Sequence, residues 1–247
     1  MPREQISITT QDGVCPATVF TPSTGSGPWP AVIYCMDALA IRPALLDASQ
    51  RLADAGFVVL TPDLFYRRGP YEPMNPKVVF ANPDVRATLG AFMSSTDNRR
   101  AAEDAGAFLA YLDTRKDVAG KKVGTTGYCM GGGMALSIAG TYPDRIAAAA
   151  SFHGGNLASD SELSPHLLAP KIKARVYIGV ADNDNSYPPE MGETLQAALR
   201  DAGVEFVSAF YPGALHGWTQ TDFPIYNQPA AERHWRDTID LFDATLR

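Results

Sequence analysis

The stretch that most constrains this chain runs from Val123 to Leu136. It begins with an apolar strand pattern, passes through a tight glycine-rich turn and continues as a helix pattern rich in alanine and leucine. The turn, residues 127–131, reads Gly-Tyr-Cys-Met-Gly and has the G-x-S-x-G spacing of a nucleophile elbow, with Cys129 at its centre. Side chains two residues either side of the apex of such a strained turn would collide, so glycine is needed at both places. The stretch therefore predicts a strand–turn–helix unit that presents Cys129.

Cys129 directly precedes the first turn of the predicted helix. Backbone N–H groups and the helix dipole favour negative charge at that end, so a thiolate would be stabilised there. The alternative interpretation is a small buried cysteine at a glycine-rich helix start. A further glycine, Gly132, together with the flanking strand and helix, favours the elbow.

Strand and helix patterns alternate along most of the chain. Apolar or alternating runs predict strands at residues 6–10, 14–21, 31–36, 57–60, 146–152, 174–180 and 205–211, in addition to the elbow strand. Helical periodicity predicts helices at residues 41–55, 84–93, 98–113, 190–202 and 230–246, in addition to the elbow helix. Residues 61–82, rich in proline and tyrosine, predict an irregular section. The alternation is typical of an α/β fold with a mostly parallel sheet covered by helices on both faces, and we expect one domain over residues 1–247 without a cap domain.

Composition restricts the class of ligand. Of 247 residues, 45% are hydrophobic and 19% charged, and the net charge is -6 with no basic cluster longer than two residues. We therefore expect a globular chain whose partner is a small molecule, and neither nucleic acid nor a membrane. Without zinc-ligand spacing of cysteine and histidine, no metal or cofactor is expected. An odd number of cysteines and no apolar signal core in residues 1–5 predict a cytoplasmic protein with free thiols, as a monomer or small homo-oligomer.

Residues suited to nucleophilic catalysis follow the predicted strands. Asp37, Cys129 and His216 stand at or after strand ends, which collect functional groups in open α/β sheets. The acid after the 174–180 strand is either Asp182 or Asp184. The order nucleophile, acid, histidine is that of α/β-hydrolases. We favour Asp184 because it stands four residues before the proline that opens the next helix, a spacing common in those enzymes.

The sequence resembles the dienelactone hydrolase family of α/β-hydrolases over nearly its whole length. The resemblance is carried by the cysteine elbow at 127–132, the Pro-Asp-Leu at 62–64 after the fourth predicted strand, the acid turn, and the pair His216-Gly217. A cysteine in an otherwise serine-type elbow is fairly specific to this family.

The resemblance implies a triad of Cys129, His216 and Asp184. Such a triad hydrolyses small activated esters or lactones through a covalent acyl-cysteine. The resemblance also implies an oxyanion hole made by the N–H groups of Ala38 and Met130.

Two positions depart from the family pattern. Family members carry glutamate after the third strand, near the thiol whose ionisation it influences; here Asp37 takes that place and is the expected thiol-modulating residue. They also hold the substrate carboxylate with arginines, one of them four residues after the histidine, where this chain has Gln220. Arg67 and Arg86 are candidate replacements. The resemblance therefore implies the chemistry rather than the dienelactone substrate.

Further side chains are expected to contact the substrate, namely His153, Trp218 and Tyr66. The loops around 66–82 and 156–170 are expected to shape a shallow pocket. The remaining thiols and imidazoles are interpreted as ordinary ones: Cys15 and Cys35 as buried packing, and His166 and His234 as surface residues.

Three other functions are compatible with the same fold. One is a general carboxylesterase or thioesterase. Another is a reactive, redox-sensing thiol without turnover, and the third is a binding protein on a hydrolase scaffold. The presence of complete triad candidates favours the ester hydrolase.

Overall fold

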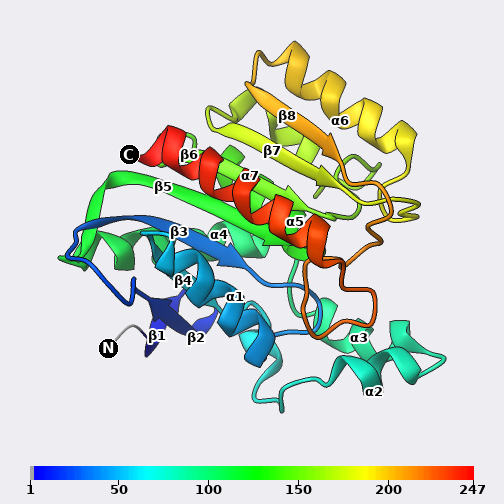
Figure 1. Ribbon diagram of the computed structural model, residues 1–247, viewed down its shortest axis with the longest axis horizontal. Helices are drawn as coiled ribbons and strands as arrows, with labels where there is room; N and C mark the ends of the chain where they lie inside the picture. Colours follow the sequence, from blue (N-terminus) through cyan, green and yellow to red (C-terminus); the bar gives the residue numbers. More distant parts are fainter. Residues whose placement is uncertain (1–2) are drawn as a thin grey trace.

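The computed structural model describes residues 3–247; residues 1 and 2 of the predicted 1–247 domain, and the side chain of Arg86, lie outside the described part. Figure 1 shows a central sheet between two layers of helices. The strands are β1 (Arg3–Thr10), β2 (Gly13–Phe20), β3 (Trp29–Cys35), β4 (Val58–Pro62), β5 (Val118–Tyr128), β6 (Ile146–Phe152), β7 (Arg175–Val180) and β8 (Phe206–Phe210). The helices are α1 (Pro43–Asp54), α2 (Pro76–Ala81), α3 (Val85–Met93), α4 (Asn98–Thr114), α5 (Met130–Thr141), α6 (Pro189–Asp201) and α7 (Gln228–Leu246), with 3-10 turns η1 (Tyr66–Arg68) and η2 (Pro165–Lys171).

The eight strands form one sheet in the order β1-β2-β4-β3-β5-β6-β7-β8. Strands β4, β3, β5, β6, β7 and β8 run parallel, and the β1–β2 hairpin joins antiparallel at one edge. Strand β3 is buried along nearly its whole length, as its continuous apolar run predicts for a central parallel strand. The predicted fold class, α/β with a mostly parallel sheet, is confirmed.

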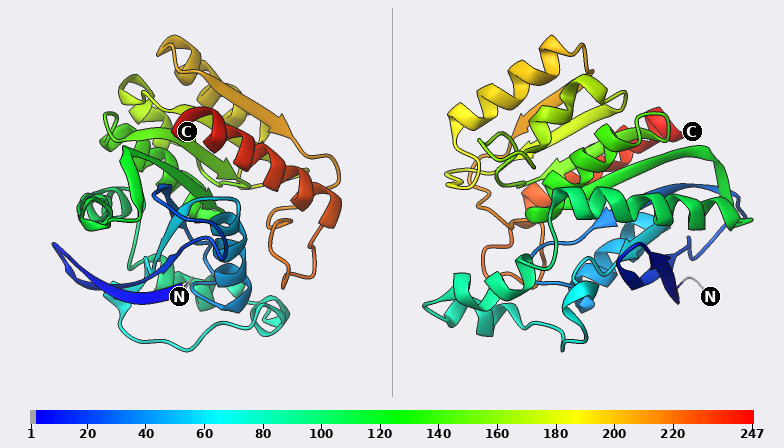
Figure 2. Two further views of the ribbon diagram at one scale, coloured as in Figure 1. Left: turned by 60° about the vertical axis from the view of Figure 1, so that its left-hand side comes forward. Right: turned by 180° about the vertical axis from the view of Figure 1, so that it is seen from behind.

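Helices cover both faces of this sheet. Helices α1 and α7 lie on one face, and α4, α5 and α6 lie on the other (Figures 1 and 2). Helix α5 is buried on nearly every side, which explains its glycine- and alanine-rich sequence. Within residues 3–247, no helix is both long enough and apolar enough to span a membrane.

Residues 61–82 are not wholly irregular, contrary to the prediction. They contain the η1 turn and helix α2, in which Pro76 opens the first turn and Asn75 caps it by accepting the N–H of Lys77 at 3.0 Å. A helix of six residues depends on its cap and on neighbouring contacts, so it leaves little periodicity in the sequence.

His234 is fully buried, so the prediction that it lies at the surface is wrong. It belongs to the face of α7 that packs on the sheet, and its Nε2 is 2.9 Å from the Tyr128 hydroxyl. Burial lowers the pKa of His234 to about 3, so the imidazole is neutral and acts as a core hydrogen-bonding group.

The carboxyl ends of the parallel strands meet at one edge of the sheet (Figure 1). Three connections leave this edge and concern the site: the turn from β5 to α5, the loop from β7 to α6, and the long loop from β8 to α7. They contain Cys129, Asp184 and His216 respectively. The topology therefore brings together residues that are far apart in the sequence.

Candidate active site

Cys129 occupies a strained position between β5 and α5. Its backbone has φ 55° and ψ -120°, a conformation that residues with a side chain rarely adopt. The turn places Cys129 as the N-cap of a buried helix, and its side chain is only half-buried. The predicted strand–turn–helix unit is present, with Cys129 at its apex.

Two glycines allow the turn to close. A Cβ at Gly127 would clash with the backbone oxygen of Gly131. A Cβ at Gly131 would clash with the backbone oxygen of Cys35 and lie 2.5 Å from that of Met36. Helix α5 therefore begins in direct contact with the end of β3, because neither glycine has a side chain.

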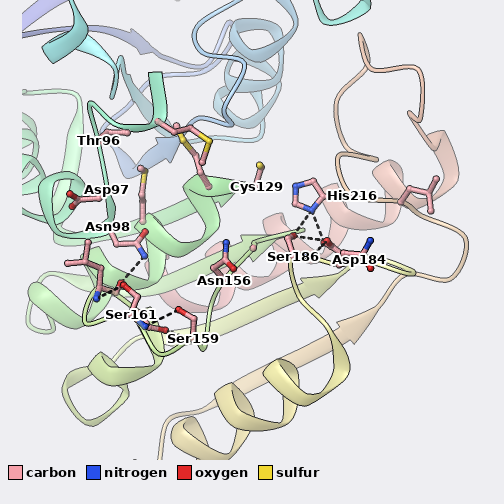
Figure 3. Close-up of a pocket in the computed structure, with 18 of the residues that line it drawn as sticks. Thr96, Asp97, Asn98, Cys129, Asn156, Ser159, Ser161, Asp184, Ser186 and His216 are labelled. Atoms are coloured by element: carbon pink, nitrogen blue, oxygen red, sulfur yellow. Dashed lines mark hydrogen bonds and ion pairs between the residues drawn. The ribbon is translucent and has the colours of Figure 1, made fainter. Parts of the chain in front are cut away.

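His216 faces this turn and is held from behind by Asp184. The Nδ1 atom of His216 lies 2.7 Å from Oδ2 of Asp184, whose side chain is almost completely buried. The other carboxylate oxygen accepts hydrogen bonds from the hydroxyl and the backbone N–H of Ser186, at 2.6 and 2.9 Å. Figure 3 shows the second ring nitrogen of His216 on the side of Cys129. With Nδ1–H donated to Asp184, the free nitrogen can exchange a proton with the thiol.

The pKa values of His216 and Asp184 are shifted in opposite directions, and each shift favours the charged form of its group. Burial lowers the pKa of His216, but the hydrogen bond to Asp184 and the interactions with Cys129 outweigh it and raise the pKa to about 10. Burial raises the pKa of Asp184, and its bonds to His216 and Ser186 more than compensate, so that pKa is lowered. Asp184 is thus ionised, and it favours a protonated imidazole beside the thiol.

Asp182 lies elsewhere in the same turn. Its carboxylate accepts the backbone N–H of Gly213 at 2.8 Å and thereby ties the β7–α6 loop to the loop after β8. Of the two predicted acids, the structure brings Asp184 and not Asp182 to His216.

Asp37 forms a buried ion pair instead of standing free beside the thiol. Its two oxygens accept bonds of 2.8 and 3.0 Å from Arg42, and the first also accepts the N–H of Leu39 at 2.8 Å. Arg42 is itself almost completely buried and bonds Asp222 at 2.8 Å and Gln220 at 3.2 Å. The ion pair therefore fixes the loop that follows β3, which is the loop that carries Ala38.

His153 lies behind the elbow rather than in the cavity. Its Nδ1 accepts the backbone N–H of Cys129 at 3.2 Å, and its Nε2 lies 2.8 Å from the hydroxyl of Thr219. Since Nδ1 is an acceptor, the ring proton belongs on Nε2. Burial, together with the neighbouring His216 ring at 5.1 Å, holds the pKa of His153 well below its ordinary value. This neutral ring supports the backbone of the nucleophile.

A cavity of about 800 Å³ opens beside Cys129, His216 and Asp184. The loop after β6 contributes much of its wall through residues 155, 156, 159, 161, 163 and 164, in agreement with the predicted role of that loop. Residues 66–82, also expected to shape the pocket, contribute no residue to its described lining. Another part of the wall comes from Met93 at the end of α3 and from residues 96–98 at the start of α4. Figure 3 shows the amide of Asn156 directed into the cavity.

The structure does not bring Trp218 and Tyr66 to this cavity. Trp218 is fully buried and stacks on Tyr211, because the loop after β8 folds inward under the site. The Tyr66 hydroxyl bonds Asp104 at 3.0 Å, on the side of the β1–β2 hairpin. Arg67 also binds Asp104, at 2.8 and 2.9 Å, and the side chain of Arg86 lies outside the described part of the structure.

The other two thiols are packing groups, as predicted. Cys15 and Cys35 are fully buried, and burial raises the pKa of both, that of Cys35 to about 12. Sequence reasoning missed two residues that position the site. Ser186 could have been recognised by its place two residues after Asp184, whereas nothing in the sequence singled out Arg42.

No group of three or more metal-ligating side chains lies together among the residues that the structure describes.

The sheet order, the elbow and the histidine–carboxylate pair define an α/β-hydrolase. Residues 15–246 match the sequence profile of the dienelactone hydrolase family. This chain therefore belongs to the dienelactone hydrolase family.

Known proteins agree with this assignment. A relative from Escherichia coli K12 named "Putative carboxymethylenebutenolidase" is 28% identical over 240 residues, which cover 96% of this chain and 84% of the relative. A relative of the same name from Yersinia pestis is 26% identical over 246 residues, covering 96% and 86%.

Solved structures share the fold. A structure described as a putative dienelactone hydrolase from Klebsiella pneumoniae superimposes with a TM-score of 0.85 at 24% identity, with 98% of each chain covered. The dienelactone hydrolase-like promiscuous phosphotriesterase P91, from metagenomic libraries, gives a TM-score of 0.79 at 23% identity over the whole of both chains.

Proposed function

We propose that this protein hydrolyses small activated carboxylic esters or lactones through an acyl-cysteine intermediate on Cys129. The observation that carries the proposal is the pairing of Asp184 with His216 on the side of the imidazole remote from the thiol. A nucleophile, a base within reach of it and an acid that orients the base are the parts that nucleophilic acyl transfer needs. Membership of a hydrolase family and relatives named for carboxymethylenebutenolidase activity support the same reaction class.

Acylation begins with the proton of the Cys129–His216 pair on the imidazole, the position that the raised pKa of His216 favours. The thiolate attacks the ester carbonyl carbon, a C–S bond forms, and the carbonyl π electrons move onto oxygen. When the tetrahedral intermediate collapses, the C–O bond to the alcohol breaks, and His216 gives its proton to the departing oxygen. Asp184 remains ionised and stabilises the imidazolium during both transfers.

The N–H groups of Ala38 and Met130 would hold the developing oxyanion. Support for this pair comes from the contact between Gly131 and the backbone at the end of β3, which makes the start of α5 and the loop after β3 neighbours. The buried ion pair of Asp37 with Arg42 keeps that loop in one conformation.

Deacylation repeats the sequence with water as the nucleophile. His216 removes a proton from water, the hydroxide attacks the thioester carbonyl, and the Cys129 thiolate leaves. Lactones, enol or aryl esters and thioesters are suitable substrates because their leaving groups depart readily from the tetrahedral intermediate of the acylation step.

Hydrolysis of p-nitrophenyl acetate by wild type, Cys129→Ala and Cys15→Ala tests the proposal. Cys129→Ala should fall to the uncatalysed rate, whereas Cys15→Ala, which removes a buried packing thiol, should stay within about threefold of wild type. A Cys129→Ala enzyme that keeps more than a tenth of wild-type kcat/KM would contradict the cysteine mechanism. A wild type that is acylated once and does not turn over would favour the redox-thiol alternative.

A further inference from the structure

The wall of the cavity beside Cys129 is negatively charged. The charged groups among its described lining residues are the carboxylates of Asp97 and Asp184 and the imidazole of His216. Asp184 is paired with His216 at 2.7 Å. Among the described lining residues, Asp97 is therefore the carboxylate that has no cationic partner in the wall.

Asp97 lines this cavity as the N-cap of α4. Its carboxylate accepts the backbone N–H of Arg100 at 2.8 Å. The guanidinium of Arg100 lies 3.7 Å from the other oxygen, but it is 43% exposed, so water screens most of this attraction. Asp97 thus keeps its negative field at the cavity.

The buried Arg42 cannot serve as a binding site for a substrate carboxylate. Its N–H groups are used by Asp37 and Asp222, and Gln220 accepts a further bond at 3.2 Å. Because the Arg42 side chain is 1% exposed, a substrate carboxylate would have to displace one of these carboxylates to reach it. Gln220 itself is buried against Arg42 and uncharged.

Uncharged hydrogen-bonding groups are abundant in the same wall. Four asparagines and five serine or threonine residues line the cavity. Asn156 has a left-handed backbone (φ 54°) and an exposed side chain, and Figure 3 shows its amide directed into the cavity. Met93, Met130 and Met134 add an adaptable apolar surface. Amides and hydroxyls recognise carbonyl and hydroxyl groups without requiring a charge.

We propose that this cavity selects uncharged esters or lactones bearing hydroxyl, amide or carbonyl groups, and discriminates against substrates that carry a carboxylate near the scissile bond. This inference rests on the proposed hydrolase function and specifies its substrate class. Asp97 is the residue that sets the discrimination, and Asn156 is the neutral contact.

A matched pair of substrates tests the selection. The p-nitrophenyl monoester of succinic acid carries a free carboxylate, and the p-nitrophenyl ester of succinamic acid replaces it with an amide of nearly the same size. Wild type should favour the amide ester by about tenfold in kcat/KM at low ionic strength, and salt should reduce this ratio because it screens the carboxylates. A preference for the succinate ester at every salt concentration would overturn the inference while leaving ester hydrolysis established.

A pair of charge-removing variants locates the effect. Asp97→Asn keeps an N-cap, since asparagine caps helices as well as aspartate does. It should raise the ratio of kcat/KM for the succinate ester to kcat/KM for the amide ester at least about threefold. Asp201→Asn, an exposed change of the same charge at the end of α6, should alter neither substrate. Equal responses in the two variants would overturn the role of Asp97. If wild type hydrolysed neither ester, the proposed function would fail, and this inference with it.

Discussion

Replacing Gly131 by alanine tests whether the contact between α5 and β3 determines the geometry of the site. The new Cβ would clash with the Cys35 carbonyl oxygen and lie 2.5 Å from that of Met36, whereas real Cβ atoms stay beyond 3.0 Å. Both obstacles are backbone atoms, so the start of α5 must move away from β3 by at least about half an ångström. Overpacking of this kind costs about 1–3 kcal/mol of stability. Since the two proposed oxyanion donors lie on the two sides of this contact, kcat should fall about 10²–10³-fold.

Gly133→Ala is the matched control, two residues further along the same buried helix. Its Cβ would lie 2.9 Å from the Asn98 side-chain oxygen, which is the end of a side chain and not backbone, and alanine gains about 0.5–1 kcal/mol over glycine inside a helix. Urea unfolding followed by circular dichroism and steady-state hydrolysis of p-nitrophenyl acetate measure the two quantities. Gly133→Ala should keep the stability of wild type within about 1 kcal/mol and at least half of its activity. A Gly131→Ala enzyme with the wild-type urea midpoint and more than half of the activity would show that the contact between α5 and β3 does not determine the geometry of the site.

Three further predictions concern the charged groups. Asp184→Asn should lower kcat/KM for p-nitrophenyl acetate about 10³–10⁴-fold while Asp182→Asn stays within about threefold, and a reversed order would reassign the acid. Arg42→Gln leaves Asp37 buried without its partner and should cost about 3–5 kcal/mol in urea unfolding; a loss below 1 kcal/mol would show that the ion pair does not hold the loop. The folded-state pKa of His216, about 10, exceeds its ordinary 6.5, so its favourable contribution to stability is complete below pH 6.5 and is lost as pH rises through about 10. The stability difference between wild type and His216→Gln should shrink across that window, and a constant difference would argue against a protonated imidazole.

The regular elements could be predicted from the sequence because each depends on a local pattern. Buried parallel strands such as Ile146–Phe152 are continuous apolar runs, and their predicted and observed bounds coincide. Helix α2 could not be predicted in this way, since a six-residue helix is too short to show a period. The burial of His234 could not be predicted either. A histidine is a polar residue, and the hydroxyl of Tyr128 that satisfies it in the core lies on another element.

The residues of the candidate site could be predicted from their places after strand ends, but the side chains that line the cavity could not. Chain order and the spacing to the next proline led to Asp184, which the structure places 2.7 Å from His216. The path of the loop after β8 decides which side chains face outward, and it buries Trp218. Arg42 was missed because its role depends on three carbonyl and carboxylate partners that only the tertiary fold brings together.

Acylation of Cys129 during turnover can be observed directly on the quenched enzyme. Wild type mixed with p-nitrophenyl acetate should be acid-quenched within the first turnover, digested and sequenced by mass spectrometry. We expect an initial burst of p-nitrophenol equal to the enzyme concentration and an acetyl group on the peptide containing Cys129, which disappears as turnover proceeds. Turnover with the acetyl group on another residue, or hydrolysis that persists at the wild-type rate in Cys129→Ala, would contradict the cysteine mechanism.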